Sequence, residues 1–377
     1  MKIWVIGRNY PEPSNNMSGS FEIEQAKMLQ KYGNNVQYIC CSFHPIKKIK
    51  NWGYQCWEEE GVRIHTNSFF FFPRIYPLYF IQLRNYYWKK FLYQIYEEEG
   101  KPDLIHIHYP AMLMLSETLR FFHNQGIKIV ITEHWSKILT NELDRIERTQ
   151  YIEYFKYISA CICVGSSLAK AVRKIVGDSN IPIHIIPNVT GEEFRPALST
   201  NNIFEFIAVG RLTEIKQFDR IIKVFSENFR GKKAQLTIIG GGEKYQLLQK
   251  MISELSMEHQ ICLTGTLSKK EVALRMASAS CLVCYSKFET FCVPIIEAWA
   301  CGIPVISTVM EATDRFDSKL GIKVSCADMG ELGKAMTYIY KNIEFYDKKY
   351  ISKFSDAMFS EKAVYEKLME VYQKMGE

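Results

Sequence analysis

Two basic side chains follow a run of residues that is typical of a buried strand. Phe206–Gly210 is apolar and ends in Gly, and Arg211 and Lys216 stand five residues apart in the turn that should open the next helix. A helix N-terminus carries partial positive charge, so both cations could converge there on one anion. A diphosphate suits this arrangement, although a solvated basic turn would contain the same residues.

Two carboxylates frame a second loop of this kind. Glu289 follows an apolar strand, and Glu297, eight residues later, falls inside the next helix. Backbone N–H groups between them could hold phosphate oxygens at the helix start, while each Glu accepts a hydrogen bond from a sugar hydroxyl. A helix cap with one surface Glu is the simpler alternative. The neighbouring run Ala298–Cys301 argues against it, because a carboxylate in apolar surroundings needs a partner.

Strands and helices that could position these loops alternate along the whole chain. Continuous apolar strands separated by helical stretches are typical of parallel, doubly wound sheets. The pattern breaks at Ile186–Gly191 and restarts, which predicts an α/β chain of two Rossmann-like domains facing a central cleft, with ligands at the carboxyl ends of the strands. The predicted strands are Ile3–Gly7, Val36–Cys41, Val62–Thr66, Leu104–His108, Ile127–Thr132, Ala160–Val164, Phe206–Gly210, Leu236–Gly240, Ile261–Gly265, Cys281–Tyr285 and Val305–Ser307. The predicted helices include Phe21–Tyr32, Phe218–Asn228 and Glu361–Met375.

Length and composition fit this organisation and exclude several classes of protein. The 377 residues suffice for two domains, which we place at 1–190 and 191–350, followed by a helical tail at 351–377. A formal charge of +6 is too mild for a nucleic-acid-binding protein but suits an anionic ligand or surface. The chain has no apolar run long enough to span a bilayer, and Met1–Gly7 is too short for a signal peptide, which indicates a cytoplasmic protein.

The 11 cysteines do not resemble a disulfide framework. Their number is odd, and most lie in apolar runs, so we interpret them as small buried hydrophobic residues in a reducing compartment. No spacing among them is typical of a zinc site. The cysteines interpreted as buried are Cys40, Cys41, Cys161, Cys163, Cys281 and Cys284.

The motifs of this chain, and the order in which they follow one another, resemble those of retaining glycosyltransferases of the GT-B type, family four. The family signature, two Glu separated by seven residues and followed by Gly-x-Pro-Val, is present from Glu289 to Val305. The Gly-Arg-Leu-x-x-x-Lys motif ends at Lys216, the strand Pro102–His108 matches the family's P-D-h-h-H-x-H, and Thr132–Trp135 matches its T-x-H loop. The resemblance covers almost the whole chain.

The resemblance implies a role for each matched residue. Arg211 and Lys216 would neutralise the donor diphosphate, Glu297 would hold the ribose, and Glu289 would contact the transferred sugar near its O3 or O4. His134 would contact the sugar from the N-terminal, acceptor-binding domain, to which the tail helix would cross back. The implied catalytic residues are Glu289, His134, Arg211 and Lys216. The implied donor-binding residues are Gly19, Gly210, Arg211, Lys216, Glu289, Phe291, Cys292, Val293 and Glu297.

The resemblance also implies the chemistry. A nucleotide-diphosphate sugar would be the donor, a glycan or a lipid-linked molecule the acceptor, and synthesis of a bacterial surface polysaccharide the setting. Retention would proceed by front-face attack, without metal or cofactor, because Arg211 and Lys216 can supply the charge that the leaving diphosphate needs. Two departures concern the backbone, since Cys292 and Gln217 stand where the family usually has Gly. A strained Cys292 could give the loop a variant shape.

The aromatic and basic stretch Phe69–Lys90, with Lys47, Lys48 and Lys50 nearby in sequence, is a candidate contact with an anionic membrane surface. Core packing and an acceptor channel are the alternatives.

Three other activities are weaker interpretations of the same sequence. A nucleotide-sugar 2-epimerase shares the two-domain shape, and a non-catalytic nucleotide-sugar-binding subunit would also bind a donor. A dehydrogenase lacks support, because Gly7 does not begin the Gly-x-Gly-x-x-Gly spacing. His106 and His108 are more consistent with strand positions near the cleft than with catalysts.

Overall fold

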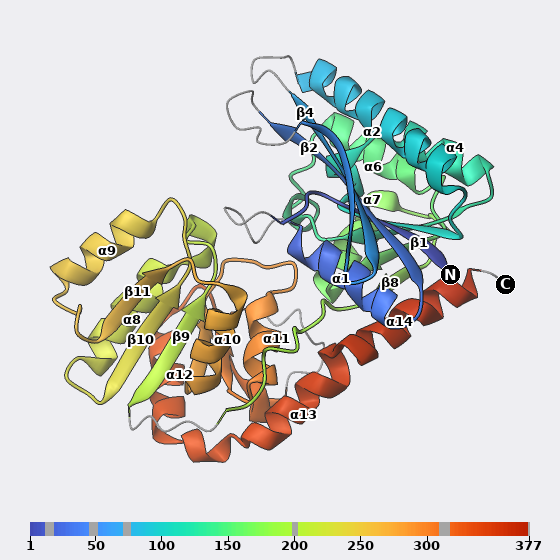
Figure 1. Cartoon of the computed structure of the whole chain (residues 1–377). Helices are drawn as coiled ribbons and strands as arrows, with labels where there is room; N and C mark the ends of the chain where they lie inside the picture. Colours follow the sequence, from blue (N-terminus) through green and yellow to red (C-terminus); the bar gives the residue numbers. More distant parts are fainter. Residues whose placement is uncertain (12–18, 45–51, 71–76, 198–202, 309–316, 376–377) are drawn as a thin grey trace. The chain divides into compact units, whose positions relative to one another are not determined.

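The computed structural model describes residues 1–11, 19–44, 52–70, 77–197, 203–308 and 317–375. The chain divides into two compact units, Met1–Pro187 with Tyr365–Glu377, and Asn188–Val364. Each unit is an α/β domain built on its own sheet (Figure 1). Among the described residues, no helix combines the length and the apolar character needed to cross a bilayer.

The first unit contains an eight-stranded sheet in the order β3-β4-β2-β1-β5-β6-β7-β8. All neighbours pair in parallel except β3 and β4, which form an antiparallel pair at one edge. Its central strands are buried on both faces, which explains their continuous apolar runs. The strands are β1 (Lys2–Gly7), β2 (Asn35–His44), β3 (Gly53–Glu59), β4 (Val62–Phe70), β5 (Leu104–His108), β6 (Lys128–Glu133), β7 (Ala160–Cys163) and β8 (Ile183–Ile185).

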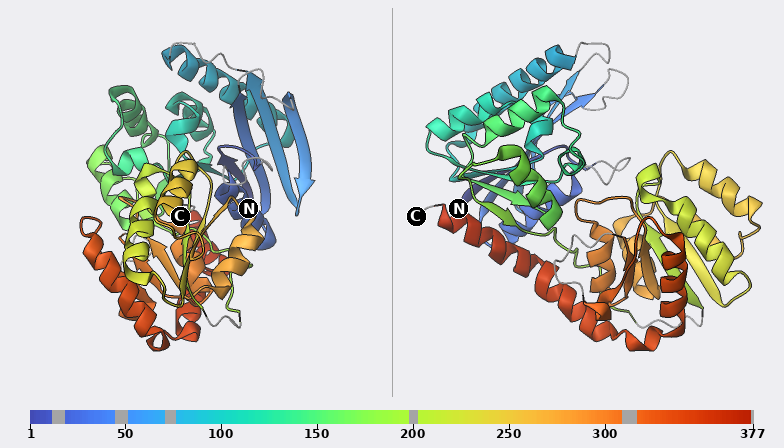
Figure 2. Two further views of the ribbon diagram at one scale, coloured as in Figure 1. Left: turned by 90° about the vertical axis from the view of Figure 1, so that its left-hand side faces the viewer. Right: turned by 180° about the vertical axis from the view of Figure 1, so that it is seen from behind.

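Helices cover both faces of this sheet. Helix α1 lies on one side and α2, α4 and α6 lie on the other (Figures 1 and 2). The helices are α1 (Ser20–Lys31), α2 (Pro77–Glu99), α3 (Pro110–Leu113), α4 (Ser116–Asn124), α5 (Ser136–Leu139), α6 (Arg145–Tyr154) and α7 (Ser166–Val176). The last helix of the chain, α14 (Glu361–Lys374), contributes its residues from Tyr365 onward to this unit, where Tyr365 stacks on Tyr32 with ring centres 4.4 Å apart.

The second unit contains a six-stranded, fully parallel sheet in the order β11-β10-β9-β12-β13-β14. This is the order of a doubly wound nucleotide-binding fold, whose switch point falls between its first and fourth strands, here β9 and β12. The strands are β9 (Phe204–Val209), β10 (Ala234–Ile239), β11 (Ile261–Gly265), β12 (Cys281–Cys284), β13 (Val305–Ser307) and β14 (Gly321–Lys323). Loops that follow β9 and β12 are therefore placed to form a ligand site.

The helices of the second unit again cover both faces of the sheet. Helix α12 packs on α8, whereas α11 packs on α10 and α13. These helices are α8 (Phe218–Phe229), α9 (Tyr245–Glu254), α10 (Lys269–Ser278), α11 (Val293–Ala300), α12 (Met329–Lys341) and α13 (Lys348–Phe359), and the 3₁₀ turns are η2 (Glu214–Lys216), η3 (Ser318–Leu320) and η4 (Ile343–Phe345).

The sequence pattern found the buried parallel strands and missed the others. Strand β3 was not predicted because an exposed, antiparallel edge strand alternates polar and apolar residues over too short a run. The three-residue strands β8 and β14 were missed as well, since three residues carry too little pattern. The predicted single tail helix is two helices, because α13 ends before Ser360 and α14 begins directly after it.

Candidate functional site

The turn after β9 is held by a second, glycine-rich loop. The Gly210 N–H donates to the carbonyl of Ile239 (3.0 Å), and the Leu212 N–H donates to that of Gly241 (2.9 Å). Gly240 has a φ of 148°, and a Cβ there would lie 1.9 Å from the Gly210 carbonyl oxygen. Sequence analysis missed this support, although three consecutive glycines after a strand were a signal for it.

Lys216 and Glu289 form the centre of the candidate site. The turn η2 after β9 carries Lys216, the loop after β12 carries Glu289, and the ammonium donates directly to Glu289 Oε1. The Ser286 hydroxyl donates to the same oxygen (2.7 Å). Burial disfavours the charge on Lys216, but the Glu289 carboxylate outweighs it and raises the pKa of Lys216. Lys216 therefore stays charged at neutral pH, and 22% of its side chain is exposed to solvent.

Arg211 has a different carboxylate partner. Its guanidinium lies 3.9 Å from Glu243 Oε2, and 72% of its side chain is exposed. In this structure each cation is paired with a different Glu, and the convergence of Arg211 and Lys216 on one anion stays a prediction. The exposed Arg211 side chain has a rotameric freedom that the Lys216 side chain, held by Glu289, lacks.

Two residues that each precede a helix of the second unit keep a backbone shape suited to glycine. Cys292 precedes the helix with a φ of 68°, and Gln217 precedes α8 with a φ of 52°. Both conformations cost a non-glycine residue about 1–2 kcal/mol. Cys292 thus adopts a left-handed conformation, which is strained for a cysteine, as the sequence analysis considered. Gln217 recovers part of its cost by donating from Nε2 to the carbonyl of Tyr285 (3.1 Å).

The other donor-site candidates of the second unit lie on α11 or next to it. Phe291 is buried and packs edge to face on Phe359, which anchors the loop to the core of the unit. Val293 begins the helix, Pro294 follows it, and Glu297 is half-buried within the helix. The loop thus presents Glu289 before the helix start and Glu297 within the first two turns.

Cys284 corrects one expectation about the cysteines. It ends β12 and is half-buried, whereas a fully buried thiol was predicted. Its Sγ lies 3.3 Å from Cys292 Sγ, and both sulfur atoms are within 4.8 Å of a Glu289 carboxylate oxygen. The hydrogen bond with Cys292 lowers the pKa of Cys284 to about 7 despite burial, and Lys216 adds to this effect. Spacings of five and three residues gave no sign of the cluster in the sequence.

In the first unit, His134 belongs to a row of buried histidines. His134 Nε2 and His108 Nδ1 share a hydrogen bond (3.1 Å), and the His134 ring stacks on Tyr109. Burial, with Arg8 and His106 nearby, lowers the pKa of His134 to about 3, so its imidazole is neutral at pH 7. His106 is fully buried in β5 and hydrogen-bonds the hydroxyl of Tyr372 on α14 (2.6 Å), which favours a structural role.

Gly19 precedes α1 with a φ of 85°. A Cβ at this position would lie 1.9 Å from the Asn9 carbonyl oxygen. This close approach explains why the position requires glycine, independently of any ligand.

Glu133 next to His134 was not identified from the sequence. It is fully buried, and its Oε1 accepts from the N–H groups of His134 (2.9 Å) and Trp135 (2.8 Å). Apart from these two N–H groups, only the Tyr151 hydroxyl among the described residues lowers the pKa of the carboxyl, and its effect is the weakest of the three. Burial therefore dominates and raises the pKa of Glu133 to about 7.

We expect Glu133 to make stability depend on pH. Because the folded pKa is raised, its contribution is complete below the unfolded value of about 4.5 and is lost as pH rises through about 7, a change of roughly 3 kcal/mol. Glu133→Gln keeps an oxygen for both N–H groups and cannot ionise. Urea unfolding between pH 5 and 8 should show the free energy of unfolding of the variant rising relative to that of the wild type as pH rises. Parallel pH profiles of the two free energies would contradict the assignment.

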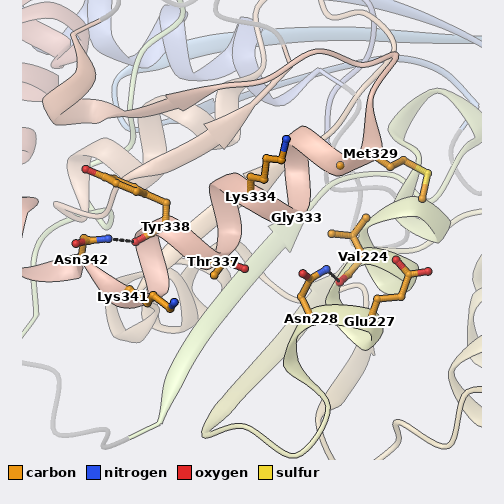
Figure 3. Close-up of a pocket in the computed structure, with 11 residues that line it drawn as sticks. Val224, Glu227, Asn228, Met329, Gly333, Lys334, Thr337, Tyr338, Lys341 and Asn342 are labelled. Carbon is orange, nitrogen blue, oxygen red and sulfur yellow. Dashed lines mark hydrogen bonds between the residues drawn. The ribbon is translucent and has the colours of Figure 1, made fainter.

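A separate hollow of about 500 Å³ lies between α8 and α12 (Figure 3). Polar and apolar side chains line it, among them Asn228 and Lys334. None of the residues that the sequence assigned to the donor lines it, so the hollow and the candidate site are different places on the second unit.

Solved structures similar to this chain define its fold. Sucrose-phosphate synthase from Thermosynechococcus elongatus superposes with a TM-score of 0.78 at 16% identity, covering 99% of this chain and 98% of that one. Anabaena HepE in complex with UDP-glucose superposes with a TM-score of 0.73 at 15% identity, covering 99% and 100%. The fold is therefore that of a GT-B glycosyltransferase.

Family models match both units. The model of glycosyltransferase family 4 matches residues 23–190, and that of glycosyl transferases group 1 matches residues 190–347. The chain belongs to the group 1 glycosyltransferases, a family of enzymes.

Curated relatives match this chain over only part of their length. A phosphatidylinositol N-acetylglucosaminyltransferase subunit from Arabidopsis thaliana is 25% identical over 213 residues, 55% of this chain and 47% of that protein. The match thus spans about half the length of that relative. N-acetyl-alpha-D-glucosaminyl L-malate synthase from Bacillus anthracis is 22% identical over 307 residues, 78% of this chain and 76% of that protein.

Proposed function

We propose that the chain is a retaining glycosyltransferase that moves a sugar from a UDP-sugar to a glycan or lipid-linked acceptor in the synthesis of a surface polysaccharide. The observation that carries this proposal is the charged Lys216, partly exposed beside Glu289 near the start of α11. A diphosphate there would meet an ammonium and the N-terminus of a helix, both of which favour negative charge. The similarity to Anabaena HepE favours UDP as the nucleotide of the donor, because HepE was solved with UDP and with UDP-glucose.

Each residue then has a part in the transfer. Lys216 neutralises the charge that develops on the leaving diphosphate, so the reaction needs no metal or cofactor. Glu289 accepts a hydrogen bond from the transferred sugar and Glu297 one from the ribose. A donor phosphate oxygen takes the acceptor proton during front-face attack, which retains the configuration of the sugar.

Arg211 and the residues of the first unit have supporting parts in this proposal. Arg211 leaves Glu243 and turns its exposed guanidinium to the diphosphate, since a contact of 3.9 Å holds it weakly. His134 contacts the sugar as a neutral imidazole, which can hydrogen-bond a hydroxyl without adding charge. Gly19 lets the backbone before α1 approach the donor.

A donor screen tests the function. The purified chain is incubated with UDP-, GDP- and ADP-sugars, and release of the nucleoside diphosphate is followed with and without added acceptors. We expect slow hydrolysis of a UDP-sugar and faster release with a suitable acceptor. Isomerisation of the donor without transfer would favour the 2-epimerase, and binding without turnover would favour a non-catalytic subunit.

We further propose that the enzyme works at the inner face of the cell membrane, with the exposed side of α2 on the anionic surface. Tyr86 is 58% exposed there, beside the exposed Lys89 and Lys90. Other parts of the aromatic stretch pack internally, since Trp88 is buried and Phe69 stacks on Tyr87 at 4.1 Å. The residues Phe71, Phe72, Arg74, Lys47, Lys48 and Lys50 lie outside the described part of the chain.

Sedimentation with liposomes tests the membrane contact. The chain should sediment with anionic but not with neutral vesicles at low salt. Lys89→Glu with Lys90→Glu should weaken binding by at least about 2 kcal/mol, because each basic residue near the surface contributes about 1 kcal/mol. The matched control is Lys170→Glu with Lys174→Glu, the same charge change on the exposed side of α7. No sedimentation with anionic vesicles, or equal losses in both variants, would refute the contact.

A further inference from the structure

Three metal-ligating side chains meet inside the candidate site. Cys284 Sγ, Cys292 Sγ and a carboxylate oxygen of Glu289 all lie within 4.8 Å of one another. The two sulfur atoms are 3.3 Å apart. Cys292 is 7% exposed and Cys284 is half-buried, so a small ion could enter from the Cys284 side and still be largely shielded from water.

Fixed elements, rather than a flexible tail, hold these three groups. Cys284 is the last residue of β12, and Cys292 directly precedes α11. Glu289 lies between them and is anchored through Oε1 by Lys216 and Ser286. Both of these hydrogen bonds use Oε1, so Oε2 remains to bind an ion. A site held by a strand end and a helix start is preorganised for its ligand.

The donor set determines which ion would bind. Two thiolates are soft ligands, which favour Zn²⁺ or Cd²⁺ over Mg²⁺. Tetrahedral zinc, with Zn–S bonds of about 2.3 Å, places two sulfur atoms roughly 3.8 Å apart, so the thiols would need to separate by only about 0.5 Å. Two thiolates and one carboxylate carry three negative charges, which the divalent ion and the Lys216 ammonium would balance. Water would complete the fourth position.

We propose that Cys284, Cys292 and Glu289 bind one soft divalent cation such as Zn²⁺, and that the bound cation competes with the sugar donor. The second half of this proposal rests on the proposed function, since it assumes that Lys216 and Glu289 contact the donor. The cation blocks the site and takes no part in the transfer. It ties Glu289 and the loop before α11 to the metal, and so removes them from the sugar and the diphosphate.

A metal titration tests the site without any reference to activity. The full chain, reduced with a phosphine and freed of metal, is titrated with Cd²⁺ while thiolate-to-metal charge-transfer absorption is followed; Zn²⁺ then competes for the site. We expect one strong site per chain with two thiolate ligands. Cys284→Ala and Cys284→Ser should weaken Cd²⁺ binding by about 100-fold or more. Mutating residues that only hydrogen-bond a metal's ligands already lowers metal affinity by about 10–100-fold, and Cys284 is itself a ligand.

Cys262→Ser is the matched control, because Cys262 is an exposed thiol of the same unit outside the cluster. The control should keep the site and the full charge-transfer absorption. Retention of the site in both Cys284 variants would overturn the proposal. So would formation of a Cys284–Cys292 disulfide under the reducing conditions, detected as two missing thiols and no metal bound.

UDP binding separates this proposal from the proposed function. If both hold, one equivalent of Zn²⁺ should weaken UDP binding to the wild type at least 10-fold and leave UDP binding to Cys284→Ala unchanged. A metal site with undiminished UDP binding would overturn the competition. A chain that binds Cd²⁺ as described but binds no nucleoside diphosphate would contradict the proposed function and leave the metal site standing.

Discussion

Lys216→Ala should lower kcat/KM for sugar transfer by about 10²–10³-fold, which corresponds to roughly 3–4 kcal/mol of transition-state stabilisation. The Glu289 carboxylate, in the loop that leads into α11, fixes the position of the ammonium. Steady-state release of nucleoside diphosphate from the donor measures the loss. Activity within 10-fold of the wild type would show that the diphosphate binds elsewhere.

Two variants sharpen this measurement. Arg211→Ala should cost less than Lys216→Ala, because Arg211 is 72% exposed and weakly paired. Lys250→Ala removes an equally charged, exposed side chain of α9 and should be neutral. Urea unfolding of Lys216→Ala is needed beside the kinetics, since the substitution leaves Glu289 with its Ser286 partner and without its cation.

Gly240→Ala should destabilise the second unit by about 2–4 kcal/mol. The added Cβ would lie 1.9 Å from the Gly210 carbonyl oxygen, and the φ of 148° is itself unfavourable for alanine. Either the strand end or the turn that carries Lys216 has to move. The free energy of unfolding, measured in urea, and the turnover of the donor should therefore fall together.

Gly231→Ala is the matched control for this crowding. Gly231 also has a positive φ, 72°, but nothing lies within 4 Å of a Cβ built there. Its cost should be limited to backbone strain of about 1–2 kcal/mol, without loss of turnover. Equal costs for both variants would show that the contact with Gly210 does not support the turn.

The sequence predicted those features whose patterns are local. Buried parallel strands such as β9 and β12 are mostly apolar, and the loops after them carry Lys216 and Glu289. The sheets and both site candidates could therefore be inferred, but the ion pair between the two residues could not. The positive φ of Cys292 could be suspected only because the residue stands in a family glycine's place.

The rest depends on tertiary contacts that no local pattern encodes. The antiparallel β3 is exposed at a sheet edge, and Arg211 takes Glu243, from the loop after β10, as its partner. The cluster of Cys284, Glu289 and Cys292 arises only because a strand end and a helix start approach each other. Burial, not sequence neighbourhood, sets the raised pKa of Glu133.

The most direct test of the account is a crystal structure of the chain with a nucleoside diphosphate, solved for the wild type and for Lys216→Ala. We predict that the diphosphate contacts Lys216 and the backbone N–H groups before α11 in the wild type, and that the site is empty in the variant at the same concentration. A diphosphate bound in the hollow between α8 and α12, or held without contact to Lys216 in the wild type, would contradict the account.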